Sequence, residues 1–454
     1  MSKNLNSYRV TAANNALTVT GDEIRQNVFI GLNAFFKMLP RVLSPRVVDL
    51  LVISSGVYVI DRIVSRTGTG GSHGGVRTFD VSIAVQDPAF WSCPEITEAL
   101  CDTLGFLTGD DWSFSFDVSA ENGYQHALPI PWTAPRRIAL VSEGLDSAAG
   151  LADQVADGQG PIMTVTVAHY SALRTRTQRQ IDTLRKQLPA AELYTASLVV
   201  GLRQGMAQNL RDQERTQRSR AFLFCAAGIA AACACGVERV DLYESGVGAI
   251  NFPLMTGMLF GGLATRGAHP TFLKKMSALS SAVAERSLVL RLPYIDSTKG
   301  EMLVRVRGLG IEPWLQRSRS CIHTSLRLPQ ITHCGVCPAC IERRQAFAVA
   351  NIEEDATAYA VDLFQGTLHG GHRRYFDLFL EEAASLLADD PRTLRRLRTC
   401  MTVTGIDGTE YPRLHRLLRR HAEEIQRVFA KPRGRDCFLP GEALAVEATG
   451  DTSS

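Results

Sequence analysis

The segment Arg137-Ile-Ala-Leu-Val-Ser-Glu-Gly-Leu-Asp-Ser147 decides the fold. A short apolar run ends at Val141, a loop with two serines, a glycine and an aspartate follows, and a helical pattern begins at Ser147. Ligands bind at the carboxyl ends of strands in open α/β sheets, and backbone N–H groups at a helix N-terminus attract anions. Gly144 allows the backbone to approach a ligand closely. The segment therefore predicts a strand–loop–helix unit that binds phosphate.

The same residues also fit an ordinary strand-to-helix turn that Asp146 or Ser147 caps. The sequence beyond the loop bears on the fold, because four more apolar runs follow at 162–167, 193–200, 239–243 and 288–292, separated by helical patterns. Strands that alternate with helices predict a parallel sheet covered on both faces.

The chain divides by composition into four parts. Residues 1–134 mix strand patterns, the first over 8–19, with helical ones, and predict an N-terminal α+β domain. Residues 135–350 hold the parallel-sheet unit. Residues 351–440 carry Leu and Phe at helical spacing and predict a helical extension. Residues 441–454 are small and polar, as in a disordered tail.

The composition indicates a cytoplasmic globular protein. A formal charge of +3 is too small to favour nucleic acid as a main partner. The first fifteen residues lack the apolar core of a signal peptide, and the odd number of cysteines, eleven, does not favour a disulfide framework. The uncharged stretch Ala221–Val237 is rich in Ala and Gly, and we interpret it as a helix buried against the sheet rather than a membrane span. The oligomeric state is left open.

Four cysteines, Cys321, Cys334, Cys337 and Cys340, have the spacing C-x12-C-x2-C-x2-C. Cys-x2-Cys steps let neighbouring thiolates reach one ion at about 2.3 Å, and Gly335 supplies the tight turn between two of them. Four thiolates without a fifth ligand predict a closed, structural Zn²⁺ site. The alternatives are an iron–sulfur cluster and unrelated buried thiols.

Together, the loop and the cysteines resemble the 7-cyano-7-deazaguanine synthase (QueC) family of N-type ATP pyrophosphatases. Ser142–Ser147 is similar to the Ser-Gly-Gly-x-Asp-Ser loop of that fold, and Thr298–Met302 resembles the Thr-Lys-x-Glu-Ile segment of the family. Cys334–Phe347 is similar to the C-terminal segment of the family, in which the motif Cys-Gly-x-Cys-x-x-Cys is followed by an Arg and then by Ala-Phe or Gly-Phe. Gln217–Ser219 stands where the family has Gly-Arg-Asn. The resemblance covers about residues 136–350 and implies a PP-loop (adenine nucleotide alpha hydrolase-like) domain.

The resemblance also implies a site for ATP and Mg²⁺. The catalytic residues that it implies are Asp146, Ser147, Lys299 and Arg218. The nucleotide-binding residues are Ser142, Gly144, Leu145, Asp146 and Ser147 of the loop, with His169 and Tyr170 after the second strand of the parallel unit. Arg220, Glu244 and Arg266 are further candidates for polar contacts.

The function that the resemblance implies is ATP-dependent C–N ligation. In the family a carboxylate, 7-carboxy-7-deazaguanine, is activated as an adenylate and captured by ammonia to give a nitrile. The extended chain looks like the QueC-like proteins of bacterial antiphage defence (Qat and type IV CBASS). That likeness implies a partner protein from the same defence operon, and a protein amine as acceptor would give an amide.

Two positions depart from the family pattern, because Glu143 replaces Gly and Ser219 replaces Asn. A carboxylate beside a triphosphate is repelled unless it points away or helps to hold Mg²⁺, and Glu adopts positive φ only at a cost. One alternative is therefore a catalytically impaired scaffold subunit of a defence complex. Another is a PP-loop tRNA-modifying enzyme, which needs catalytic thiols, whereas Cys225, Cys233 and Cys235 fall on the apolar helix.

Overall fold

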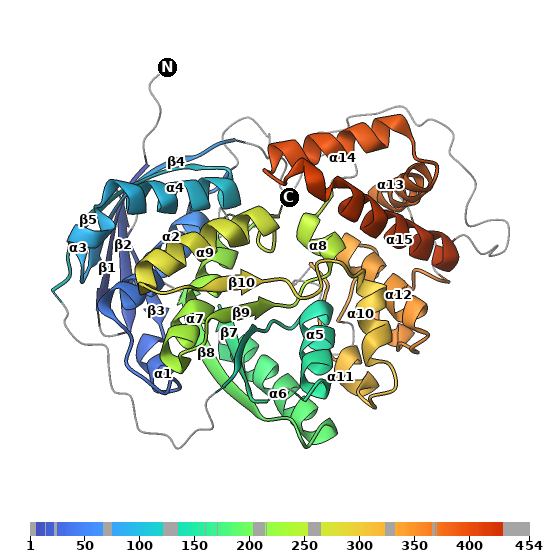
Figure 1. The fold of residues 1–454 in the computed structure, drawn as a ribbon, viewed down its shortest axis with the longest axis horizontal. Helices are drawn as coiled ribbons and strands as arrows, with labels where there is room; N and C mark the ends of the chain where they lie inside the picture. The colour runs from blue at the N-terminus through green and yellow to red at the C-terminus, as the bar shows by residue number, and fades with distance from the viewer. Residues whose placement is uncertain are drawn as a thin grey trace, which may run out of the picture.

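One ten-stranded sheet runs through the computed structural model (Figure 1), in the order β10-β9-β6-β7-β8-β3-β2-β1-β4-β5. Neighbours from β10 to β8 are parallel, those from β8 through β3 and β2 to β1 are antiparallel, and β1, β4 and β5 are again parallel. The strands are β1 (Asn6–Ala13), β2 (Ala16–Gly21), β3 (Arg25–Ile30), β4 (Thr78–Val85), β5 (Asp111–Val118), β6 (Arg137–Leu140), β7 (Ile162–Ala168), β8 (Leu193–Leu202), β9 (Arg239–Leu242) and β10 (Val289–Arg291).

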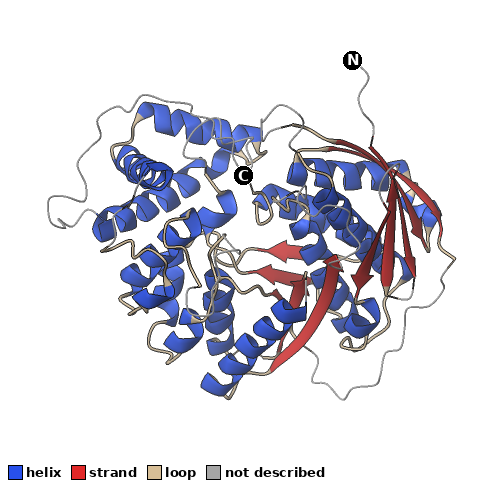
Figure 2. Cartoon of the chain, turned by 180° about the vertical axis from the view of Figure 1, so that it is seen from behind, coloured by secondary structure: helices blue, strands red, loops and turns tan. Residues whose placement is uncertain are grey.

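Helices cover both faces of the parallel strands β6–β10, whereas the strands β1–β5 have helices on one face and expose alternate side chains of β1 and β3 on the other (Figure 2). The helices are α1 (Leu32–Phe36), α2 (Pro45–Ile63), α3 (Pro88–Trp91), α4 (Pro94–Thr108), α5 (Leu145–Ala156), α6 (Ser171–Gln187), α7 (Arg220–Cys235), α8 (Gly246–Ile250), α9 (Pro270–Ala284), α10 (Lys299–Val306), α11 (Glu312–Gln316), α12 (Pro338–Ala350), α13 (Gly370–Leu387), α14 (Pro391–Val403) and α15 (Tyr411–Phe429). The structure describes residues 6–13, 15–21, 25–66, 75–120, 135–158, 160–169, 171–202, 214, 216–252, 265–322, 332–365, 368 and 370–429.

The alternation of side chains along β6 divides the core into two layers. Ile138 and Leu140 pack with α2, α4, α7 and α9, whereas Ala139 and Val141 pack with α5, α6 and α10–α12. The small residues of α7 allow close packing, because a Cβ at Gly228 would lie 2.8 Å from side-chain atoms of Leu140 and Val240. The uncharged stretch expected to be a buried helix is therefore the helix that covers β6 and β9.

The N-terminal strands extend the sheet of the central unit. β3 pairs antiparallel with β8, in the register Val28↔Leu202 and Ile30↔Val200. The backbone N–H of Gly31 continues this joint by donating to the carbonyl of Val199 at 2.8 Å. The apolar side chains of the N-terminal strands belong to the same core cluster as those of α7 and α9.

The C-terminal helices α13–α15 have their own apolar core and lie beside α10 and α12 (Figure 1). Thr298, the N-cap of α10, donates its hydroxyl to Glu424 of α15 at 2.6 Å. Gln345 of α12 donates to the other oxygen of Glu424 at 3.2 Å. The C-terminal helices are thus hydrogen-bonded to the N-terminus of α10.

The expected fold class is confirmed: a mixed α/β fold with a mostly parallel sheet, a helical C-terminal region and a four-cysteine group that could bind zinc. The strand expected over 8–19 is in fact a hairpin, β1 and β2, and Asn15 at φ 61° turns the chain between them. No helix in the described part of the chain is long and apolar enough to cross a bilayer. The tail 441–454 and Tyr170 lie outside the described residues.

Candidate functional site

The loop after β6 presents hydroxyls and a helix N-terminus that no side chain caps. The hydroxyls of Ser142 and Ser147 lie 3.0 Å apart, and the N–H of Gly144 donates to Ser142 Oγ at 3.2 Å. Gly144 is the N-cap of α5, and no side chain caps the helix there. Leu145 is buried in the core, so its backbone alone faces the loop. These donors and the positive end of α5 fit a phosphate.

The loop lies where the strand order reverses. From β6 the chain builds β7 and β8 on one side, and then returns to place β9 and β10 on the other. Such switch points are where open α/β sheets bind ligands. The loop after β9 meets the phosphate loop here, because the N–H of Ser245 donates to Asp146 Oδ2 at 3.1 Å.

Lys299 joins this site from α10. Its Nζ lies 2.9 Å from Asp146 Oδ1 and 3.5 Å from Glu342 Oε2. Burial alone would raise the pKa of Asp146, but the charge of Lys299 and the hydrogen bonds from Glu244, Lys299 and Ser245 together outweigh it and hold that pKa below its usual value. Burial would likewise lower the pKa of Lys299, but Asp146 and Glu342 raise it, so the ammonium stays charged.

Glu244, after β9, is the third carboxylate near Lys299. Burial and the neighbouring charge of Asp146 raise the pKa of Glu244 well above its usual value. The proton that it holds is shared in a hydrogen bond with Asp146. The site therefore sets the carboxylates of Asp146 and Glu342 and the carboxylic acid of Glu244 around one lysine.

The carboxylate of Glu143 is paired with a cation. It accepts from Arg176 of α6, with Nε 2.7 Å from Oε1 and Nη2 3.4 Å from Oε2. Glu143 does not have a positive φ, so the residue carries no left-handed strain. Its carbonyl accepts the N–H of Arg319. Glu in place of Gly is thus accommodated at this position, because the guanidinium of Arg176 pairs with its carboxylate.

Arg218 and Ser219 connect α7 to the N-terminal region. Arg218 donates to the carbonyl of Thr108 at 2.9 Å, and its charged neighbours are Arg66, Asp110, Asp61 and Glu214. The N–H and hydroxyl of Ser219 donate to Asp61 at 2.9 and 2.7 Å. The structure does not place Arg218 in the charge group around Lys299.

His169 lies at the carboxyl end of β7 and contacts the N-terminal region. Its Nδ1 lies 2.9 Å from Tyr58 Oη, and the two rings stack with centroids 5.2 Å apart. Burial lowers the pKa of His169 to about 3, with further contributions from Arg220 and Arg62. His169 is therefore neutral at physiological pH. Arg266, a further candidate, donates to the carbonyl of Phe106 at 2.9 Å.

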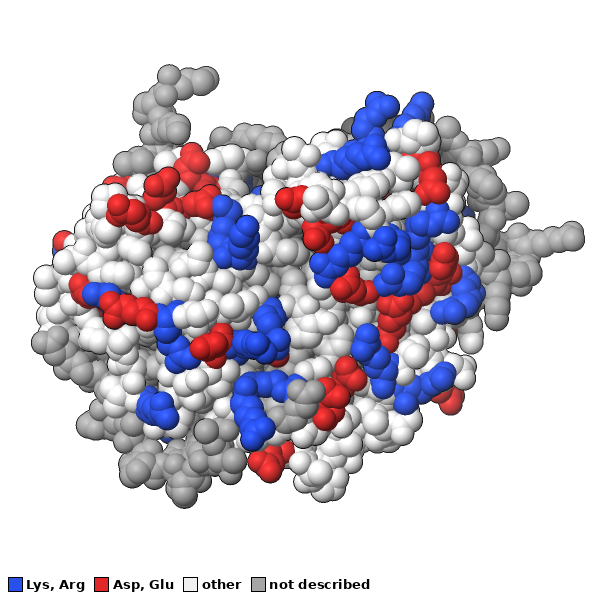
Figure 3. Space-filling model, in the orientation of Figure 1, with Lys and Arg blue, Asp and Glu red and all other residues white. Residues whose placement is uncertain are grey.

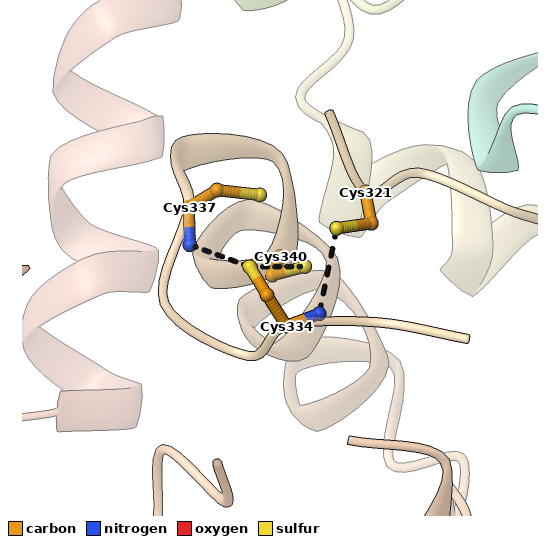
Figure 4. Close-up of side chains that lie close together, drawn as sticks. All are labelled: Cys321, Cys334, Cys337 and Cys340. Atoms are coloured by element: carbon orange, nitrogen blue, oxygen red, sulfur yellow. Dashed lines mark hydrogen bonds between the residues drawn. The ribbon is translucent and has the colours of Figure 1, made fainter. Parts of the chain in front are cut away.

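The four cysteines converge on one point (Figure 4), and their sulfurs all lie within 4.8 Å of one another. A tetrahedral ion with bonds of about 2.3 Å needs sulfurs about 3.8 Å apart, and Cys334 Sγ lies 3.9 Å from Cys340 Sγ. Backbone N–H groups donate to the sulfurs of Cys321 and Cys334 at 3.4 and 3.3 Å. Gly335 makes the turn at φ 85°, where a Cβ would lie 1.8 Å from the carbonyl of Val361. The ligand set and spacing fit Zn²⁺.

The cysteine group and the lysine site share helix α12. Cys337 is its N-cap, Cys340 is in its first turn, and Glu342 follows two residues later. Arg343, which is 1% exposed, donates to Glu354 at 2.6 Å and to the carbonyl of Ser318 at 3.0 Å. Sequence reasoning missed Glu342, although it lies inside the recognised segment, because only the packing of α12 against α10 reveals its partner.

The three thiols of α7 are poor nucleophiles. Burial raises the pKa of Cys233 to about 11 and that of Cys235 to about 12, and it also raises the pKa of Cys225. On the face drawn in Figure 3, Lys and Arg alternate with Asp and Glu. Neither observation favours the tRNA-modifying alternative.

Two comparisons relate the chain to known proteins. The sequence model described as "Queuosine biosynthesis protein QueC" matches residues 267–351, a stretch that contains Lys299 and all four cysteines. A 7-cyano-7-deazaguanine synthase of Methylobacillus flagellatus is 27% identical over 236 residues, which are 50% of this chain and 96% of the relative. The aligned half of this chain therefore covers nearly the whole length of the relative.

Proposed function

We propose that this protein uses ATP to activate a carboxylate as an adenylate and passes the acyl group to an amine, as the resemblance to the 7-cyano-7-deazaguanine synthase family implies. The observation that carries the proposal is the meeting of the uncapped phosphate loop with the Lys299–Asp146 pair at the switch point of the sheet. The substrate that the relationship favours is 7-carboxy-7-deazaguanine.

In the first step a carboxylate oxygen attacks the α-phosphorus of ATP, the bond to the β-phosphate breaks, and pyrophosphate leaves. The N–H groups of α5 and the hydroxyls of Ser142 and Ser147 hold the phosphates. Lys299 stabilises charge that develops on the transferred phosphoryl group. Mg²⁺ bound with ATP would supply further positive charge.

In the second step an amine nitrogen attacks the acyl carbon, the C–O bond to AMP breaks, and the nitrogen loses a proton to solvent. Ammonia as acceptor leads to a nitrile after a second activation, and an amine on a partner protein gives an amide. We propose a role in antiphage defence with a partner from the same operon on the likeness of the extended chain to defence-type QueC-like proteins.

The structure gives little support to a scaffold that has lost activity. Arg176 binds Glu143 at 2.7 Å, so that carboxylate does not oppose a triphosphate, and Asp146, Ser147 and Lys299 are all in place.

The test is ATP–pyrophosphate exchange with 7-carboxy-7-deazaguanine. We expect exchange in the parent protein, none with Asp146→Ala, and little change with Glu143→Gly. If the parent protein shows no exchange and Glu143→Gly restores it, the parent is instead a catalytically impaired scaffold subunit. A parent and Glu143→Gly that both lack exchange, although they bind ATP, would refute adenylation of this carboxylate.

A further inference from the structure

Strand β5 forms the border of the sheet in the N-terminal region (Figure 1), and among the described residues only β4 pairs with it. The pairing with β4 is continuous from Thr78↔Asp111 to Val85↔Val118, so no bulge interrupts β5. The strand contains neither Pro nor Lys, and its two charges, Asp111 and Asp117, lie near its ends. Edge strands are usually protected by Pro, Lys, a bulge or a short length, because an open edge is a template for pairing. β5 lacks these protections.

The backbone of β5 directs alternate residues away from β4. The N–H of Asp111 donates to the carbonyl of Arg77 at 2.9 Å, and the N–H of Ser119 donates to the carbonyl of Val85 at 2.8 Å. Alternate residues of a strand bond to the same neighbour, so the odd-numbered residues from 111 to 119 bond to β4. The even-numbered residues turn their N–H and C=O groups to the open side; they are Trp112, Phe114, Phe116 and Val118.

The side chains of the same even-numbered residues form an apolar row along the edge. The rings of Trp112 and Phe114 are stacked with centroids 6.0 Å apart, and those of Phe114 and Phe116 with centroids 6.1 Å apart. Trp112 is buried, but Phe114 and Phe116 are only half-buried. Val118, which continues the row, is 76% exposed. A further strand beside β5 would remove part of this apolar surface from water.

The apolar row is complementary to itself when two copies of β5 run antiparallel about Ser115. In this register Phe114 of one copy lies opposite Phe116 of the other, and Trp112 lies opposite Val118. These are the residues whose backbone groups face the open side, so each would exchange both hydrogen bonds with the residue opposite it. Aromatic pairs and pairs of an aromatic with a β-branched residue are favourable across strands.

The polar row on the other face of β5 fits the same register. Ser113, Ser115 and Asp117 are exposed on this face. About Ser115, the carboxylate of Asp117 lies opposite the hydroxyl of Ser113, and Ser115 lies opposite its own copy. Asp117 is already paired with Arg9 of the same chain, at 2.8 Å. No two like charges therefore lie opposite each other.

The neighbouring registers fit less well. Antiparallel pairing about Phe114 would place Asp111 directly opposite Asp117, and like charges directly opposite are destabilising. Pairing about Phe116 would leave Trp112 beyond the end of the other strand. The register about Ser115 is thus the one that pairs the whole apolar row without opposing two carboxylates.

We propose that β5 is a dimerisation edge, at which it pairs antiparallel with β5 of a second copy of this chain around a two-fold axis at Ser115. The sheets of the two copies would then be continuous across the axis. A second copy fits better than an unrelated strand, because both halves of each side-chain pair are present in the one segment Trp112–Val118. The pairing does not depend on the proposed activity.

The first test measures the mass of the full-length protein by sedimentation over a range of concentrations. We expect a dimer that dissociates on dilution. Ser115→Lys would bring two ammonium groups together at the axis and should raise the Kd of the dimer at least about tenfold. The matched control is Ser7→Lys, at an exposed position on the same face of β1, and should leave the Kd unchanged. Melting curves verify that both variants are folded.

A monomeric parent protein at every concentration would overturn the inference, and would leave this edge to a different chain. A parent dimer that Ser115→Lys does not weaken would place the contact between copies elsewhere and would also overturn it. If Ser115→Lys does not fold, cross-linking decides.

Cross-linking tests the register directly. Opposite residues without backbone bonds between them have Cα atoms about 4.5 Å apart, which is within the range that a disulfide spans. Ser115→Cys should therefore give a covalent dimer on mild oxidation, seen on a non-reducing gel. The control Ser113→Cys should not, since its two copies would lie four residues apart along the strands, or about 13 Å. The parent protein gives the background from its own cysteines. Equal cross-linking of both variants, or none with Ser115→Cys, would refute the pairing.

Discussion

Lys299 Nζ lies 2.9 Å from Asp146 Oδ1, although the two residues begin different helices on different segments of the central unit. Burial favours the neutral form of both side chains, and each residue helps to keep the other in its charged form. Lys299 therefore remains a charged ammonium next to the phosphate loop.

Lys299→Met should lower the rate of ATP–pyrophosphate exchange by about 10²–10³, because one preorganised group that stabilises developing charge is worth that factor. Lys274→Met, at an exposed lysine of α9, is the control and should keep the parent rate. Exchange rates are measured at saturating ATP, with melting curves to verify folding. Parent-like exchange in Lys299→Met would remove Lys299 from the mechanism.

Arg176→Ala should raise KM for ATP, because Glu143 would then be free to repel the phosphates. We expect an increase of about tenfold at low ionic strength, and less at high salt. The double variant Arg176→Ala with Glu143→Gly should restore the parent KM for ATP, because the repelling carboxylate is then absent. Arg179→Ala, at an exposed position of the same helix, should change nothing. If the double variant stays as weak as Arg176→Ala, Arg176 acts through something other than Glu143.

Cys334→Ser should abolish the binding of one Zn²⁺ per chain, measured by elemental analysis. Since metal binding contributes directly to folding, we expect the melting temperature to fall by about 10 °C or more. Exchange should fall too, because the same helix carries Glu342 to Lys299. Cys101→Ser, on α4, should keep the metal and the melting temperature. Retention of the metal by Cys334→Ser would refute a four-thiolate site.

Glu424→Gln should change how stability depends on pH. Burial raises the pKa of Glu424 from 4.5 to about 7, while its hydrogen bonds to Thr298 and Gln345 partly oppose this shift. The folded protein therefore binds this proton more tightly than the unfolded chain. The resulting stability is complete below pH 4.5 and is lost as the pH rises to about 7, to the extent of about 3 kcal/mol. Urea denaturation between pH 5 and 8 should show this decline in the parent, and a smaller decline in Glu424→Gln. Equal slopes would mean that Glu424 titrates normally.

The features predicted correctly from the sequence are those whose parts lie close together in the chain. The strand and helix around Ser142–Ser147 and the thiolates from Cys334 to Cys340 are local, so spacing alone indicates their geometry. The alternation of strands and helices likewise predicts the parallel sheet correctly.

Features that depend on distant segments were missed. Glu342 reaches Lys299 only because α12 packs on α10, and Arg176 reaches Glu143 from a different helix. The β3–β8 joint and the hydrogen bond between Thr298 and Glu424 likewise depend on tertiary packing. Contacts between segments that are distant in the chain leave no periodic signal in the sequence. For this reason none of these features was predicted.

The antiparallel joint between β3 and β8 has a consequence for shortened chains. Removal of residues 1–134 would strip β8 of its neighbour and leave a row of unpaired N–H and C=O groups along the edge of an otherwise intact parallel sheet. Such an edge is a template for pairing with other chains. A protein cut at residue 134 would therefore be prone to aggregate, even with an intact phosphate loop, unless another strand covered that edge.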